Sequence, residues 1–138
     1  MPHNFIPDPA TDSEYLAKVY EAAKLGSFDA MVKLSEYAGR RGAIVEAFYW
    51  LALADLKGAK GLNKALHALT MSWMAAGCPA QHDNVYAGFP ECCGMFSRAL
   101  LRLRSGVDAA SAVERMRKLA EDGCEEAGLI LKRMESGR

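Results

Sequence analysis

Cysteine and histidine are the side chains of this sequence best suited to chemistry, and four of them gather in one region. Cys78 and His82 are separated by three residues, and Cys92 and Cys93 follow further along the chain. Thiolates and imidazoles are ligands that suit Zn²⁺. The spacing is irregular, however, and adjacent cysteines at a helix start would point about 100° apart. We therefore expect small buried thiols and a surface histidine, with no metal and no cofactor.

Nucleophilic catalysis would need one of these cysteines to lie beside a base. His82 with Cys78 or Cys92 would make such a pair, but no known nucleophile motif surrounds either cysteine. We therefore expect no enzyme and no catalytic residue. The alternative that stays open is a small metal-binding or Cys/His-dependent module that uses residues 78–93.

Bulk composition narrows the class of protein further. The 138 residues are 51% hydrophobic and carry 17 basic and 17 acidic side chains, which fits one globular domain without net charge. A neutral chain lacks the field that would collect nucleic acid or an anionic membrane. No run approaches the ~20 apolar residues of a membrane span, and the proline-rich start lacks the features of a signal peptide. We expect a cytoplasmic protein with reduced cysteines.

Apolar positions at steps of three and four predict helices along nearly the whole chain. Residues 1–11 are expected to be an extended lead-in because they hold three prolines, and residues 12–138 to form one helical domain with an irregular loop at 78–90. The first helix should begin at Asp12 or Ser13 and end at Gly26. The remaining helices are expected over 28–38, 43–57, 60–76, 91–105, 108–122 and 124–136, with a turn at Gly39-Arg40-Arg41-Gly42.

A glycine followed at four-residue steps by two small or apolar residues recurs three times. Gly26 and Gly58 are 32 residues apart, and Gly58 and Gly123 are 65 apart, close to twice as far. Repeats of about 34 residues built from helix pairs are typical of α-solenoids. The three copies are Gly26/Ala30/Leu34, Gly58/Leu62/Leu66 and Gly123/Ala127/Leu131. We expect Leu34, Trp50 and Ala54 to be buried where helices of a pair meet.

The residues that lead into two of these glycines carry a resemblance to a known family. Residues 47–58 read AFYWLALADLKG, and residues 112–123 repeat this frame with Arg115 in place of the aromatic residue. In these segments the chain resembles the Sel-one-like repeat family, which is related to the tetratricopeptide repeats. The usual loop between helices is shortened, however. The resemblance implies an all-α superhelix, or solenoid, of about seven antiparallel helices in repeats of about 34–36 residues, one of them irregular.

The same resemblance implies an adaptor that binds another protein or a peptide, with the first helix of each pair on the concave side. Lys33, Tyr37, Arg40 and Arg41 are then expected near that side. An aromatic ring among cations suits an acidic peptide. These four residues are the predicted binding surface.

The middle of the chain breaks the repeat. A helix pair is missing between Gly77 and Glu91, so the flanking helices should lack a regular neighbour there. No lysine or arginine occurs from Ala65 to Ser97. We expect Tyr86 and Phe89 to be partly exposed and to mediate self-association, which would make the protein a homo-oligomer.

Overall fold

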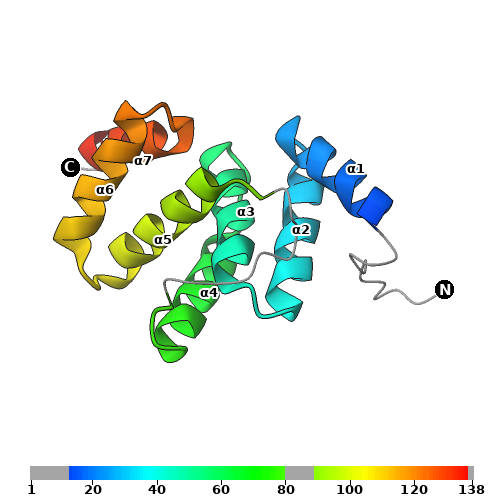
Figure 1. Cartoon of the computed structure of the whole chain (residues 1–138), viewed down its shortest axis with the longest axis horizontal. Helices are drawn as coiled ribbons and strands as arrows, with labels where there is room; N and C mark the ends of the chain where they lie inside the picture. The colour runs from blue at the N-terminus through cyan, green and yellow to red at the C-terminus, as the bar shows by residue number, and fades with distance from the viewer. Residues whose placement is uncertain (1–12, 80–88, 137–138) are drawn as a thin grey trace.

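The computed structural model describes residues 13–79 and 89–136, and this part of the chain is helical with no strand. The prediction of an all-α fold is confirmed, and each expected helix is present within a few residues of its expected bounds. The turn expected at residues 39–42 is shorter, because Gly39 and Arg40 still belong to a helix. The helices are α1 (Ser13–Lys24), α2 (Phe28–Arg40), α3 (Ile44–Leu56), α4 (Asn63–Ala75), α5 (Glu91–Ser105), α6 (Ala109–Glu121) and α7 (Glu125–Ser136) (Figure 1).

The glycines of the recurring frame end their helices in one common way. At the end of α3, Gly58 has φ 113°, a left-handed conformation that glycine adopts without a Cβ penalty. The amide of Gly58 donates to the carbonyl of Asp55 at 3.1 Å, and that of Ala59 donates to the carbonyl of Ala54 at 2.9 Å. The same pair of hydrogen bonds ends α1, α2, α4 and α6. This stop reverses the chain so that the next helix can pack on the one before.

Helix α3 lies at the centre of the described structure. Every residue from Val45 to Ala54 is buried, so the helix has no solvent face over this stretch. It packs against α2, α4, α5 and α7. The nearly continuous apolar sequence of α3 is the reason, because a helix that is hydrophobic all round must be covered on every side. Leu34, Trp50 and Ala54 are buried as predicted.

An aromatic cluster joins α3 to the start of α5. The Tyr49 ring lies edge-on to Trp50, Phe89 and Phe96, with centroid distances of 5.0, 5.4 and 6.1 Å. Such edge-to-face pairs add to the free energy gained by burying the rings. Phe89 is only 5% exposed. Its expected partial exposure is therefore wrong, because the ring fills the core beside α3; Tyr86 lies outside the described residues.

Helices α4 and α5 have neighbours, contrary to the expected gap. Both pack on α3 and on one another, and α5 also packs on α6. The Ser97 hydroxyl donates to the carbonyl of Val45 at 2.7 Å and ties α5 to α3 in the core. Helix α3 therefore supplies the packing partner that α4 and α5 were expected to lack.

Candidate functional site

An open cleft of about 360 Å³ lies between α4 and α7, and residues of α3 and α5 also line it. Helix α4 packs on α3 and α5, whereas α7 packs on α3 and α6, and α4 and α7 make little or no contact with one another. The cleft exists because nothing in the described structure fills the space between them. It is lined by Ala52, Asp55, Leu56, Leu66, Leu100, Leu103, Arg104, Ile130, Arg133 and Met134.

Most of this lining is aliphatic, and it comes from four helices. Leu66 and Ile130 are buried at its floor, Leu100 is 9% exposed, and Met134 is 42% exposed. Leu66, Leu100 and Ile130 lie on the buried faces of α4, α5 and α7, because residues three and four positions apart share one face of a helix. A concave, aliphatic surface with a few polar groups at its rim is the usual form of a ligand-binding site in a protein.

The polar groups of the cleft are two arginines and one aspartate. Arg133 donates from Nη1 to Oδ2 of Asp55 at 2.9 Å, and this ion pair joins α7 to α3. Arg104 donates from Nη2 to the amide oxygen of Asn63 at 3.3 Å, which joins α5 to α4. None of the ion pairs among the described residues includes Arg104. Because the lining holds two arginines and one aspartate, the rim carries one more positive charge than negative charge.

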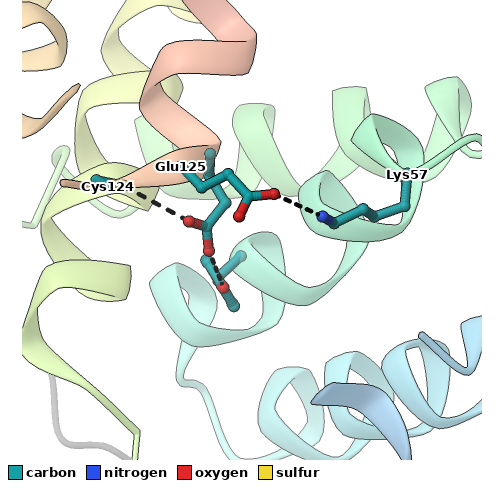
Figure 2. A network of polar contacts seen from close by, with 5 residues as sticks. Lys57, Cys124 and Glu125 are labelled. Atoms are coloured by element: carbon teal, nitrogen blue, oxygen red, sulfur yellow. Dashed lines mark hydrogen bonds and ion pairs between the residues drawn. The ribbon is translucent and has the colours of Figure 1, made fainter. Parts of the chain in front are cut away.

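A second set of polar contacts holds the start of α7 on α3, and we call it the α3–α7 network (Tyr49, Lys57, Cys124, Glu125 and Glu126). The Tyr49 hydroxyl donates to Oε2 of Glu126 at 2.6 Å, and Lys57 pairs with Oε1 of Glu125 at 3.2 Å. The Cys124 thiol contacts Oε1 of Glu126 at 3.7 Å. Figure 2 shows the network where the two helices meet. Together with Arg133, it fixes α7 as one wall of the cleft.

The thiols next to this network are poor nucleophiles near neutral pH. Burial raises the pKa of Cys93 from its ordinary value of 9.0 to about 12, with a smaller upward contribution from Glu126. Burial also raises the pKa of Cys124, and Glu126 raises it further. Since the thiolate is the reactive form of cysteine, both thiols stay protonated and weakly reactive. The Tyr49 hydroxyl, which is buried beside Cys93 and Glu126, likewise has a raised pKa.

The candidate metal ligands do not form a metal site in the described part of the chain. There, no three His, Cys, Asp or Glu side chains are placed to hold one ion. Cys92 is exposed, whereas Cys78 and Cys93 are half-buried on different elements. His82 lies outside the described residues, as does most of the loop expected at 78–90.

The four residues of the predicted binding surface lie on or next to α2, and none of them lines the cleft. Lys33, Arg40 and Arg41 are exposed. Tyr37, in contrast, is only 4% exposed, so an incoming peptide could not lie along its ring face. The Arg41 guanidinium already covers that ring at 4.3 Å from its centroid. The expected aromatic contact for a peptide is therefore occupied from within the chain.

Sequence reasoning missed the cleft because its leucines follow the same periodicity as core leucines. One signal was available, however. Asp55 is the only charged residue between Ala47 and Leu56 in an otherwise apolar segment. A lone carboxylate on such a helix needs a cationic partner or access to water. Here it has both at the cleft rim.

Comparisons with known proteins place no further constraint on the site. No model of a protein family matches the chain. No curated protein and no solved structure shows a significant match. Among the described helices, none is long and apolar enough to cross a membrane.

Proposed function

We propose that this protein is a non-catalytic binding module of the Sel-one-like repeat type that holds a segment of another protein in the α4–α7 cleft. The observation that carries the proposal is the cleft itself, which is open, aliphatic at its floor and charged at its rim. A groove between helices is a common way to bind a peptide segment.

The helix pairing supports the repeat assignment. The pairs α1/α2, α3/α4 and α6/α7 are each joined through a glycine of the recurring frame, and the two helices of each pair are in contact. Those three glycines have φ values of 106°, 113° and 99°. In a superhelix of such pairs, α5 would be the irregular element, since it has no partner of this kind.

Photo-crosslinking in the native cell tests the proposal. p-Benzoylphenylalanine at Met134 places the reactive group at the rim of the cleft, and the same group at Lys18 on α1 is the control. We expect Met134 to give one discrete adduct that maps to a single peptide of a single partner. The adduct should disappear when Leu103→Gln is added, provided that the melting temperature is unchanged.

A third position, Lys33, tests the surface that the sequence predicted on α2. An adduct from Lys33 with none from Met134 would move the binding site to that surface and would refute the cleft. Adducts from Met134 that persist in the Leu103→Gln background, or that match those from Lys18, would also refute it.

A further inference from the structure

The charges at the cleft rim indicate what kind of segment it accepts, and this inference rests on the proposed function. We propose that the occupant is an acidic amphipathic helix, which inserts aliphatic side chains between α4 and α7 and presents a carboxylate to Arg104. The size of the cleft, its charge and the arrangement of its walls all favour such an occupant.

The cleft has room for a few side chains of a ligand but not for the surface of a folded protein. Its volume of about 360 Å³ is near the lower end of the ~300–1,000 Å³ typical of ligand sites. Leu66, Leu100 and Ile130 at the floor offer contacts only to aliphatic or aromatic groups. A polar side chain placed there would lose its water without gaining a hydrogen bond, at a cost in free energy. One or two large apolar side chains therefore suit this floor.

The positive charge of the rim favours an acidic residue next to those apolar side chains in the bound segment. Arg104 has a neutral amide oxygen as its hydrogen-bond partner, at the long distance of 3.3 Å. Arginine binds a carboxylate through two parallel hydrogen bonds, which are shorter and stronger than a bond to an amide. A carboxylate from the occupant would replace the Asn63 contact and neutralise the excess positive charge. A lysine at the same place would face Arg104 and be repelled.

Asp55 makes the site selective rather than merely basic. It pairs with Arg133 at 2.9 Å, so this arginine already has a carboxylate partner before any ligand binds. An occupant with several clustered carboxylates would have to compete with Asp55 for Arg133. One carboxylate next to aliphatic side chains is the pattern that adds an ion pair at Arg104 without breaking the existing pair.

The arrangement of the walls favours a helical occupant. Helices α4 and α7 flank the cleft; α4 packs on α3 and α5, and α7 packs on α3 and α6. A further helix laid between them would pack on helices at its base and on both sides. On such a helix, an aliphatic residue and an acidic residue three or four positions apart lie on the same face. One face could then reach the floor and Arg104 together.

Selection from a random 16-residue peptide library by display tests the inference without a known partner. We expect wild-type protein to enrich peptides with aliphatic residues at helical spacing and a Glu or Asp three or four positions from one of them. Arg104→Glu protein should not enrich these peptides, whereas Lys18→Glu, which makes the same kind of charge change on α1, should. Both substituted side chains are exposed, so both variants should keep the wild-type melting temperature.

A charge exchange then gives the quantitative test. An enriched acidic peptide should bind Arg104→Glu protein at least tenfold more weakly than wild type. Its twin with lysine in place of the acidic residue should recover affinity for Arg104→Glu protein.

The outcomes separate the two proposals. Enrichment of uncharged or basic aliphatic peptides, bound in a way that Leu103→Gln abolishes, would keep the cleft as a binding site and overturn its acidic preference. Enriched peptides whose affinity for wild-type and Arg104→Glu protein is equal would overturn the role of Arg104. Failure to enrich any peptide that depends on Leu103 would count against both proposals.

Discussion

The hydrogen bond from Tyr49 to Glu126 should contribute more to stability than any other contact of the α3–α7 network. Tyr49→Phe removes it together with the contact of the same hydroxyl to the Cys93 thiol. The substitution removes one oxygen and leaves the ring in its edge-on contacts with Trp50, Phe89 and Phe96. No cavity of consequence forms, because Phe fills the same volume. The change in stability then reports on the hydroxyl alone.

The size of the effect follows from the charge and burial of the pair. A hydrogen bond to a charged group contributes ~1.5–3 kcal/mol when it is buried. Glu126 is half-buried, so water would replace part of the lost interaction. We expect Tyr49→Phe to lower the free energy of unfolding by about 1–2 kcal/mol. In a chain of this length that corresponds to a fall of about 3–8 °C in melting temperature.

Urea unfolding followed by circular dichroism measures this change, and a double-mutant cycle assigns it. Glu126→Ala alone and combined with Tyr49→Phe should give a coupling free energy of about 1 kcal/mol. Lys57→Met is the contrast within the same network. Its ion pair with Glu125 is solvent-exposed on both sides, so its loss should change stability by less than ~0.5 kcal/mol. Additive effects of the two substitutions at Tyr49 and Glu126 would show that the 2.6 Å contact contributes nothing of its own.

Three further predictions use the same unfolding measurement. Ala54→Leu should cost about 1–3 kcal/mol by overpacking, because Ala54 is fully buried on α3; a stability equal to wild type would mean that this face has room. Ser97→Ala should cost about 1 kcal/mol through loss of the 2.7 Å bond to Val45, with Ser97→Cys failing to restore it fully. The raised pKa of Cys93, about 12 against 9.0, means that the unfolded chain loses this proton first as pH rises. Stability should therefore fall between about pH 9 and 12, and more gently in Cys93→Ala; parallel curves for the two proteins would exclude this thiol as a cause.

The helices of this protein could be predicted from sequence because the signals that define them are local. Gly26, Gly58 and Gly123 are read directly from the chain, and a helix ends at each of them. The glycine amide donates to the carbonyl three positions earlier, and the amide of the next residue donates to the carbonyl five positions before itself. The burial of α3 could be predicted for a similar reason, since an apolar run without a polar face has to be covered. Neither inference requires knowledge of which distant segments meet.

The proposed binding surface could not be predicted from the sequence, because it depends on which faces remain uncovered after packing. Tyr37 looked like an accessible aromatic residue among cations, yet its side chain turns inward and Arg41 closes over it. Phe89 followed a proline- and glycine-containing segment and was expected at the surface, but it completes the aromatic cluster around Tyr49. In both cases tertiary contacts override a pattern that is sound for an isolated segment.

The cleft could not be predicted from the sequence for a related reason. Leu66, Leu100 and Ile130 lie far apart in the sequence, and each is indistinguishable from a core residue by its spacing. They line a cleft only because α4 and α7 both pack on α3 with little or no contact between them. Periodicity reports that a face is apolar, but it does not report whether another helix arrives to cover that face.

Helix α7 links the stability of the fold to the proposed binding, since it is a wall of the cleft and polar contacts help to hold it on α3. Glu126 and Arg133 contact α3 residues across this junction, and Glu125 pairs with Lys57 at the C-cap of α3. A peptide that contacts α4, α5 and α7 together would bind only when α7 is docked, so binding and docking must favour one another to the same extent. An acidic peptide at a hundred times its Kd should raise the free energy of unfolding by about 2.7 kcal/mol. Loosening α7 with Tyr49→Phe should weaken the binding of that peptide although Tyr49 does not line the cleft, whereas Lys57→Met should leave the affinity nearly unchanged.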